Sequence, residues 1–328
     1  MGTMTVLSGG LFTSVQDLGR PGHARIGVSA AGAADALEFR IANRLAGNPD
    51  NAPALEMTIL GGSFLFETAA HVAIAGADMR PMIEHPEAGV HQAPDRYAAG
   101  RGAPMFATFT VAAGQRLRLG PAPSGARAYL AVHGGLDVGL VLGSASTHVP
   151  SRLGGFLGRP LRQGDRLRFA DAPAPPLLRR LEEASHGPLA FRSTLRVTDG
   201  AQSTRFAAAS REILLGSQYA VTNESDRMGL RLAGPAIPPP HAGGMATEGM
   251  PLGAVQIPPG GEPVILFVDH QTTGGYPVIA SVISADLHHV GQLRPRDRVR
   301  FEPVTLRVAR DLLLEQEAWL AAALPAVR

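Results

Sequence analysis

Two short apolar runs flank a polar segment in the second half of the chain. Residues 264–268 are five apolar residues in succession, and residues 278–283 form a second, mostly apolar run. Runs of this length are typical of fully buried β-strands. The residues between them are polar groups, glycines and turn formers: Asp269, His270, Gln271, Thr272, Thr273, Gly274, Gly275, Tyr276 and Pro277. The pattern predicts two buried strands joined by a polar, glycine-containing segment.

This polar segment has two interpretations. Hydrogen-bonding side chains between buried strands cost free energy unless they face a cleft or one another. The adjacent Gly274 and Gly275 let the backbone turn, or approach a ligand, where a side chain would clash. The segment is therefore either the wall of a ligand site or a glycine turn whose polar groups satisfy each other.

Most of the remaining chain consists of short apolar stretches punctuated by Gly and Pro, which is typical of strands and turns. Strands are expected at residues 64–66, 72–74, 108–111, 115–119, 127–132, 195–198 and 213–215. Helices are expected at residues 33–45 and 306–324, with a short one at residues 177–184. The segment DAPAPP, residues 171–176, has the composition of a linker. These patterns predict a mainly β chain with a few helices.

The two halves of the sequence resemble each other. AYLAVHGG followed by GRPLRQGDRLRF matches ILFVDHQTTGG followed by GQLRPRDRVRF, and TSVQDLGRPG loosely matches AVTNESDRMG. A repeat of more than about 100 residues indicates two homologous domains, because solenoid repeats are much shorter. We expect barrel-like β domains at residues 1–174, with an inserted helix, and 187–328, with a C-terminal helix. Paired halves favour a site between domains, where ligand pockets often lie.

Composition excludes several classes of function. The chain has 328 residues, of which 45% are hydrophobic and 18% charged, enough to bury a large core. No apolar run approaches the roughly 20 residues that a membrane-spanning helix needs, and no signal-peptide pattern opens the sequence. We therefore expect a cytoplasmic protein without a membrane partner. A net charge of +2 spread along the chain does not indicate nucleic-acid binding.

Two amino acids are missing altogether. Without cysteine the chain has no thiolate nucleophile and no cysteine-ligated zinc site. Lysine is also absent, so all 30 Lys-plus-Arg residues are arginine. This excludes a lysine Schiff base, a P-loop and the covalent attachment of biotin to this chain. Any such group must come from another polypeptide. Histidine spacing does not favour a metal site.

Three further positions could bind an anion. Arg20 and Arg227 each lie in a turn after a predicted strand, and arginine binds carboxylates or phosphates with paired hydrogen bonds. The alternative is an ion pair within the chain, of Arg20 with Asp17 or of Arg227 with Asp226. His133 precedes two glycines, whose amides form either an anion-binding nest or a plain tight turn.

Several blocks of sequence resemble one protein family in the same order. They are TSVQDLGRPGHARIGVSAAGAAD, ANRLAGN, ALEMT, IAGAD, AYLAVHGGLDV, LGSASTHV, SDRMGLRL, EGMPLGAVQIPPGGEPVIL and DHQTTGGYPVIA. Together they are similar to the family of C-type 5-oxoprolinase subunits, also called KipA or allophanate hydrolase subunit 2. The family is homologous to the second half of the carboxyltransferase module of urea carboxylase. His270 departs from the pattern, since arginine is more usual there, and the exchange weakens any anion site at that position.

The resemblance implies two cyclophilin-like β-barrel domains and an obligate partner, the B-type subunit, which is similar to allophanate hydrolase subunit 1. With its A-type and B-type subunits, the family's complex converts 5-oxoproline to glutamate using ATP. The homologues fused in urea carboxylase move a carboxyl group from carboxybiotin to urea, so biotin on a partner chain is the alternative cofactor. A third alternative is a regulatory binding protein without enzymatic activity. A 5-oxoprolinase component that is inactive alone is the preferred hypothesis.

The motif positions then supply candidate site residues for a small amide or lactam substrate. Ring opening of a lactam needs carbonyl activation and stabilisation of an oxyanion. The candidates for catalysis are Asp269, His270, Gln271 and Thr273. The candidates for substrate binding are Gly274, Gly275, Tyr276, Arg227, His133 and Arg20, with Arg227 expected to hold a carboxylate.

Overall fold

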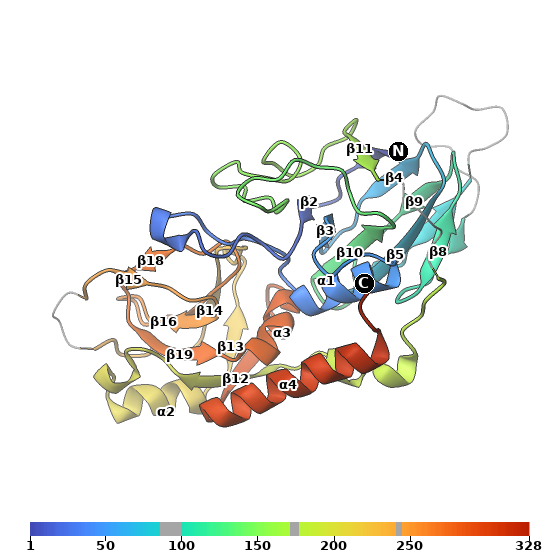
Figure 1. The fold of residues 1–328 in the computed structure, drawn as a ribbon. Helices are drawn as coiled ribbons and strands as arrows, with labels where there is room; N and C mark the ends of the chain where they lie inside the picture. Colours follow the sequence, from blue (N-terminus) through green and yellow to red (C-terminus); the bar gives the residue numbers. More distant parts are fainter. Residues whose placement is uncertain (86–99, 171–176, 241–244, 328) are drawn as a thin grey trace. The chain divides into compact units, whose positions relative to one another are not determined.

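The computed structural model describes residues 1–85, 100–170, 177–240 and 245–327 (Figure 1). The chain divides into two compact units. The first unit comprises Met1–Gly19, Ala36–Leu189 and Leu320–Arg328, and the second comprises Arg20–Asp35 and Ala190–Trp319. The linker expected at residues 171–176 lies outside the described residues, and the boundaries at 174 and 187 stay a prediction.

The first unit contains two antiparallel sheets. The larger has the order β11 (Arg166–Phe169), β1 (Gly2–Ser8), β4 (Ser63–Phe66), β9 (Arg116–Arg118), β6 (Met82–Glu84) and β7 (Arg101–Gly102). The smaller has the order β2 (Thr13–Gln16), β3 (Ala54–Thr58), β10 (Arg127–Val132), β5 (Ala70–Gly76) and β8 (Thr108–Val111). Side chains of both sheets share one apolar core. All six residues of β10 are buried, which explains why its sequence, RAYLAV, lacks the polar alternation of a half-exposed strand.

Helix α1 (Ala36–Leu45) covers strands β5 and β10 of the first unit. Its apolar face carries Phe39, whose ring meets that of Tyr129 edge to face with centroids 5.7 Å apart. The helix ends before Gly47, which adopts a left-handed conformation (φ 77°) that glycine tolerates best. The predicted helix at residues 33–45 is thus confirmed, with its start three residues later.

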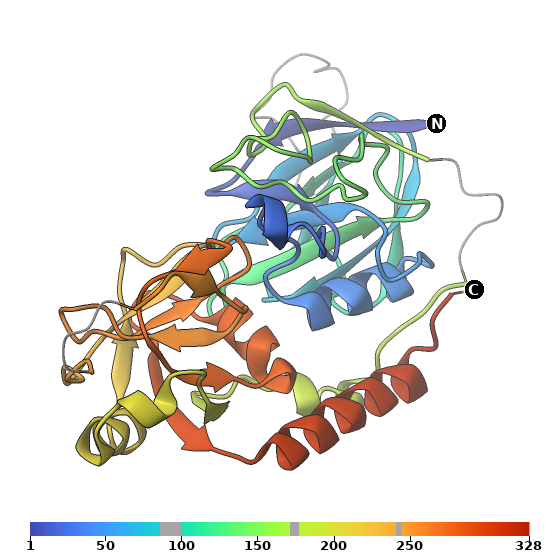
Figure 2. The same ribbon diagram turned by 60° about the vertical axis from the view of Figure 1, so that its left-hand side comes forward.

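The second unit is built on a closed barrel of seven strands (Figure 2). Their order is β12 (Thr194–Asp199), β19 (Val278–Val282), β16 (Ala254–Gln256), β17 (Val264–Leu266), β14 (Gly229–Ala233), β13 (Tyr219–Val221) and β20 (Arg298–Pro303). The parallel pair of β12 and β20 closes the barrel, and the other neighbouring strands of the barrel pair antiparallel. Closure leaves no free sheet edge among these strands. The prediction of a mainly β fold is confirmed, and the second unit has the predicted barrel, whereas the first unit consists of two sheets.

Three helices belong wholly or largely to the second unit. They are α2 (Ala208–Gly216), α3 (Leu287–Gln292) and α4 (Leu306–Ala323), whose last residues belong to the first unit. Residues 213–215, predicted as a strand, lie in α2. Ser210 and Leu214 are the buried residues of this helix and are four positions apart, which is a helical spacing that a run of three apolar residues does not reveal.

The short helix predicted at residues 177–184 is wrong. Residues 179–181 instead pair with residues 106–108, with Thr108 N–H donating to the Arg179 carbonyl and Leu181 N–H donating to the Phe106 carbonyl. Short 3₁₀ turns follow at Glu183–Ser185 and Gly187–Leu189. Pairing with a distant segment therefore decides the conformation here. In the part of the chain that is described, no helix combines the length and apolarity needed to cross a membrane.

Candidate functional site

The polar segment of the second unit leaves the barrel and returns to it. Strand β17 precedes it and β19 follows it, so the two buried strands predicted from the apolar runs are confirmed. Within the segment, β18 (Thr273–Gly274) pairs with β15 (Glu248–Gly249) as a two-stranded ribbon outside the barrel. The first half of the segment, Asp269 and His270, is buried or half-buried, whereas the second half, residues 271–276, contains the ribbon strand β18 and is mostly exposed.

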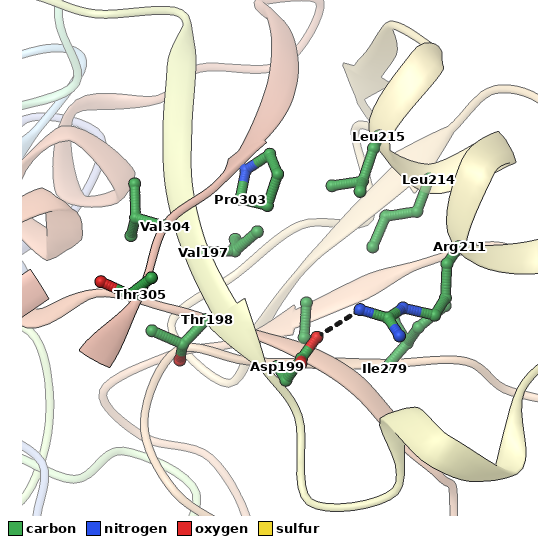
Figure 3. A pocket seen from close by; sticks show the side chains of 11 residues that line it. Val197, Thr198, Asp199, Arg211, Leu214, Leu215, Ile279, Pro303, Val304 and Thr305 are labelled. Atoms are coloured by element: carbon green, nitrogen blue, oxygen red, sulfur yellow. Dashed lines mark hydrogen bonds and ion pairs between the residues drawn. The ribbon is translucent and has the colours of Figure 1, made fainter. Parts of the chain in front are cut away.

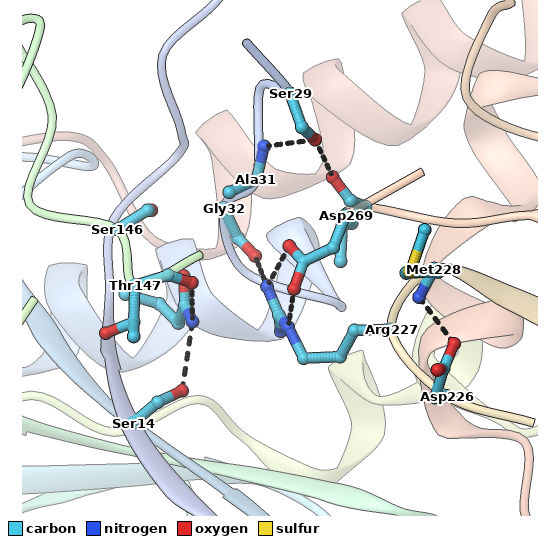
Figure 4. A network of polar contacts seen from close by, with 12 residues as sticks. Ser14, Ser29, Ala31, Gly32, Ser146, Thr147, Asp226, Arg227, Met228 and Asp269 are labelled. Carbon is cyan, nitrogen blue, oxygen red and sulfur yellow. Dashed lines mark hydrogen bonds and ion pairs between the residues drawn. The ribbon is translucent and has the colours of Figure 1, made fainter. Parts of the chain in front are cut away.

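The first half of the segment contains a buried ion pair. Arg227 donates from Nε to Asp269 Oδ2 at 2.9 Å and from Nη2 to Asp269 Oδ1 at 3.0 Å (Figure 4). Arg227 Nη2 also donates to the carbonyl oxygen of Gly32 at 2.7 Å. Arg227 is 9% exposed and Asp269 3%. Two parallel hydrogen bonds give this pair the paired geometry that arginine forms with carboxylates.

The ion pair fastens residues 20–35 to the rest of the second unit. Besides the Arg227–Gly32 bond, Ser29 Oγ donates to the carbonyl of Val268 at 3.4 Å. The backbone of Asp269 donates to the carbonyl of Arg227 at 2.8 Å, which fixes both partners in one register. Arg227 and Asp269 thus bind each other, and the observed contacts give them a structural role. The proposed role of Arg227 as a substrate carboxylate binder has no support from these contacts.

The ion-pair alternative for Arg227 named the wrong partner. Asp226 instead accepts hydrogen bonds at Oδ1 from the N–H groups of Met228 and Gly229, which is the behaviour of an aspartate that stabilises a turn. Arg20 is 2% exposed, and its backbone N–H donates to the carbonyl of Ala30. The carboxylate of Asp17 accepts from the hydroxyls of two serines and from two backbone amides in the first unit: Ser144, Ser146, Gly19 and Ala145.

His270 lies at the boundary between the two halves of the segment. Its Nδ1 is 2.7 Å from the carbonyl oxygen of Gln271, an acceptor that requires a proton on Nδ1. Burial lowers the pKa of His270, against the opposing effects of that hydrogen bond and of Asp269. The imidazole is therefore neutral at pH 7, with Nδ1 as its donor. Asp269 does not form a dyad with it, because Arg227 occupies the carboxylate.

The second half of the segment borders a pocket of about 190 Å³. Gln271 and Tyr276 line it together with Gln256, Asp226 and Arg231. Tyr276 is 47% exposed, and Gln271 is also exposed, so both can meet a ligand. Strands β14, β16 and β17 and the turns beside them supply the rest of the lining, which mixes amide, carboxylate and guanidinium groups with apolar side chains. Such a pocket suits a small polar molecule, since drug-sized ligands occupy about 300–1,000 Å³.

The buried side chain of Gln256 links two residues of the pocket, Gln271 and Tyr276. It is 2% exposed and accepts a hydrogen bond at Oε1 from Gln271 Nε2 at 3.4 Å. Its Nε2 donates to the carbonyl of Tyr276 at 3.3 Å and contacts the sulfur of Met250 at 3.0 Å. The pairing of β16 with β19 shifts register between Val255 and Gln256. A bulge of this kind re-aims a side chain, and here the buried amide reaches Gln271 and Tyr276.

The two glycines of the segment differ in the space around them. A Cβ on Gly274 would lie 2.9 Å from Gln256 Nε2 and 3.0 Å from Met250 Cγ, whereas one on Gly275 would meet nothing closer than 4.0 Å. Gly274 is therefore required by close packing against Gln256. Thr273 is exposed and pairs through its backbone with Gly249. Neither glycine has a positive φ, so the expected tight glycine turn is absent at these two positions.

Comparison with known proteins identifies the family. Residues 26–303 match the family described as carboxyltransferase domain, subdomain A and B. The chain belongs to this family. It is 34% identical over 322 residues to the C-type subunit of 5-oxoprolinase from Escherichia coli strain K12, a match that covers 96% of this chain and 98% of that protein. The C-type 5-oxoprolinase subunit of Haemophilus influenzae is 34% identical over 309 residues, covering 94% and 93%.

A solved structure extends the comparison to larger enzymes. The crystal structure of the K. lactis urea amidolyase superimposes with a TM-score of 0.85 at 32% identity. The match covers 98% of this chain but 20% of that chain, so the likeness concerns one part of a much longer protein. The resemblance to C-type 5-oxoprolinase subunits inferred from the sequence blocks is thus confirmed over nearly the whole chain.

The counterpart of the segment in the first unit is a turn. The Nδ1 atom of His133 is 2.7 Å from the carbonyl of Ala46. The amide of Gly134 donates to Asn48 Oδ1 at 2.8 Å, and the amide of Gly135 donates to the carbonyl of Val132 at 2.9 Å. Both amides are used inside the chain. The tight-turn alternative therefore accounts for these contacts, and the anion-binding nest has no open donors here.

Sequence reasoning did not single out Gln256 and Arg231 among the residues that line the pocket. Gln256 left a signal, because a glutamine inside the apolar stretch AVQI must satisfy its amide when that stretch is buried. No feature of the sequence marks Arg231 as a site residue, since it alternates with apolar residues on an ordinary strand. Among the described residues, no cluster of three or more His, Asp or Glu side chains is arranged to hold a metal ion.

Proposed function

We propose that this chain is the C-type subunit of an ATP-dependent 5-oxoprolinase, which converts 5-oxoproline to glutamate together with A-type and B-type subunits. The observation that carries the proposal is its 34% identity to the E. coli relative over 96% of this chain and 98% of that protein. Similarity along the full length of both proteins favours a shared role more strongly than similarity to a fraction of a larger enzyme.

The pocket beside Gln271 supports the proposal through its size and its groups. Side-chain amides can both donate to a lactam carbonyl and accept from a lactam N–H, as Gln271 would need to do. Arg231 offers a guanidinium for the substrate carboxylate. Asp226 lines the same pocket, and its Oδ1 is engaged in the turn. Gln271 would bind the substrate directly, and Gln256 would position it.

Partner chains complete the activity in this proposal. ATP would be bound through the complex, since this chain carries no P-loop and no lysine to contact a phosphate. Opening of a stable lactam ring requires the free energy of ATP hydrolysis, and the groups of this pocket would only bind the substrate. The isolated chain is therefore expected to be inactive and to gain its function on assembly with the A-type and B-type subunits.

The proposal is tested by expressing the chain with both partners and measuring ATP-dependent release of glutamate from 5-oxoproline. Gln271→Ala should lower kcat/KM about tenfold or more through the loss of one or two hydrogen bonds to the substrate, without preventing assembly. Gln218→Ala, an exchange of the same kind outside the pocket, should leave it unchanged. Turnover at the wild-type rate in Gln271→Ala would remove the assigned site, and no turnover in the wild-type complex would remove the proposed function.

A second candidate function is carboxyl transfer from carboxybiotin on a partner chain to a small amide. The family description, carboxyltransferase domain, and the structural match to urea amidolyase favour it. The absence of lysine agrees with a biotin carried elsewhere. Incubation of the same complex with a carboxybiotinylated partner and urea separates the two: transfer without glutamate release supports the second candidate.

A further inference from the structure

A second pocket of the second unit lies between helix α2 and strands β12, β19 and β20 (Figure 3). Its volume is about 250 Å³. None of its lining residues also lines the pocket of Gln271 and Tyr276. Ligand binding at this second pocket therefore does not depend on the function proposed above.

One side of this pocket is apolar. Val197, Leu214 and Ile279 are each 2% exposed and form its floor, and Leu215 and Pro303 stand at its walls. Figure 3 shows Leu214, Leu215 and Pro303 around the same space as Val197. The surface suits an apolar group of a few carbon atoms, whose transfer out of water is favourable.

The other side of the pocket carries opposite charges. Arg211, on α2, donates from Nη2 to Asp199 Oδ1 on β12 at 2.7 Å. The side chains are 44% and 68% exposed, so this ion pair is solvated and contributes little to stability. Among the described residues, Arg211 Nε and Nη1 and Asp199 Oδ2 have no hydrogen-bond partner. The rim thus offers donors for an anion beside an acceptor for a cation.

We propose that this pocket binds a free α-amino acid with a branched apolar side chain, such as leucine. The carboxylate is bound by Arg211 and the ammonium group by Asp199, while the side chain lies on Val197, Leu214 and Ile279. A zwitterion matches the rim because its two charges are as close together as those of the ion pair. The apolar floor excludes polar amino acids, since a buried polar group without a partner costs free energy.

The position of the pocket connects it to the candidate site through one strand. Ile279, in its floor, lies three residues after Tyr276, on β19. The loop after Asp199 binds the same strand, because Gly200 N–H donates to the carbonyl of Ile279 and Gln202 N–H to that of Val278. An amino acid held by Asp199 thus contacts β19, the strand that follows Tyr276 of the other pocket.

Isothermal titration calorimetry of the purified chain with L-leucine tests the proposal. Saturable binding of one leucine per chain is expected. N-acetyl-leucine, which lacks the ammonium charge, and leucinamide, which lacks the carboxylate, should each bind about tenfold or more weakly, because each loses a charge-assisted hydrogen bond. Glycine should give no measurable heat, because it has no side chain for the floor.

Two variants and one control locate the binding. Arg211→Gln and Asp199→Asn should each weaken leucine binding about tenfold. Arg310→Gln, which removes an exposed arginine of α4 outside the pocket, should bind leucine like the wild type. Circular dichroism spectra that match the wild type check that each variant folds. The absence of saturable binding, equal affinity for glycine and leucine, or unchanged affinity in both variants would overturn the proposal.

Discussion

The two halves of the segment from Asp269 to Tyr276 are equally polar in sequence but differ in what surrounds them. Asp269 is buried and its carboxylate is occupied by Arg227, which in turn holds Gly32. Gln271 and Tyr276 are exposed at the edge of a pocket and rest on the buried amide of Gln256. Neighbouring motif residues can thus belong to the scaffold and to the site respectively. A motif match alone does not separate the two.

The two halves of the segment are also expected to differ in how much they contribute to the free energy of unfolding. A buried ion pair is costly to break because removal of one partner leaves an uncompensated charge in a poorly solvating environment. An exposed glutamine at a pocket has water as an alternative partner, so its loss is expected to change activity and leave stability almost intact. Substitutions in the buried half should therefore lower stability most.

The largest effect is expected from breaking the buried pair. Arg227→Met and Asp269→Asn should each lower the free energy of unfolding by about 3–5 kcal/mol, because each leaves one charge unpaired or poorly paired. Urea denaturation followed by circular dichroism measures this. The double variant Arg227→Met/Asp269→Leu, which removes both charges, should recover part of the loss. A stability loss in Asp269→Asn no larger than that of the surface control Gln218→Ala would contradict the structural role.

A second prediction concerns acid sensitivity of a buried group outside the segment. Burial, together with neighbouring His288, lowers the pKa of His289 to about 3. The unfolded chain therefore binds a proton at this histidine below its usual pKa of about 6.5, and the folded chain does not until about pH 3. Stability from this residue is present above pH 6.5 and is lost as the pH falls from 6.5 towards 3.

Replacement of His289 should remove that loss. His289→Phe is expected to shift the midpoint of acid unfolding to lower pH, because the variant has no group there to take up a proton in the unfolded state. His71→Phe, at a more exposed histidine of the first unit, serves as the comparison. Unfolding curves recorded from pH 7 to pH 3 give the midpoint of acid unfolding for each protein. The same midpoint in wild type and His289→Phe would show that the burial of this side chain does not govern acid stability.

The smallest effect is expected from the two glycines. Gly274→Ala should destabilise the chain by about 1–3 kcal/mol, because the new methyl group meets Gln256 and Met250 at tight distances. Gly275→Ala, at an open position, should change stability by no more than about 0.5 kcal/mol. Thermal denaturation of the pair provides the measurement. Equal effects of the two exchanges would show that Gln256 does not pack against the segment as described.

Local patterns in the sequence were enough for elements whose surroundings are uniform. The strands at residues 264–268 and 278–283, the helix at residues 33–45 and the long C-terminal helix follow from the periodicity of apolar residues. The blocks of similar sequence pointed to the family that the comparisons then showed. The predicted strand at residues 213–215 and the helix at residues 177–184 were wrong because packing and long-range pairing override three or four local residues.

The candidate site was predicted only in part, and the reason is physical. The sequence by itself determined which segment is polar, which residues it contains, and that no lysine or cysteine can act in this chain. The tertiary structure decided that Asp269 binds Arg227, 42 residues away, and that Gln271 rests on Gln256, 15 residues away. Apolar periodicity is a local property, whereas these partners meet through strand register and a bulge in the closed barrel.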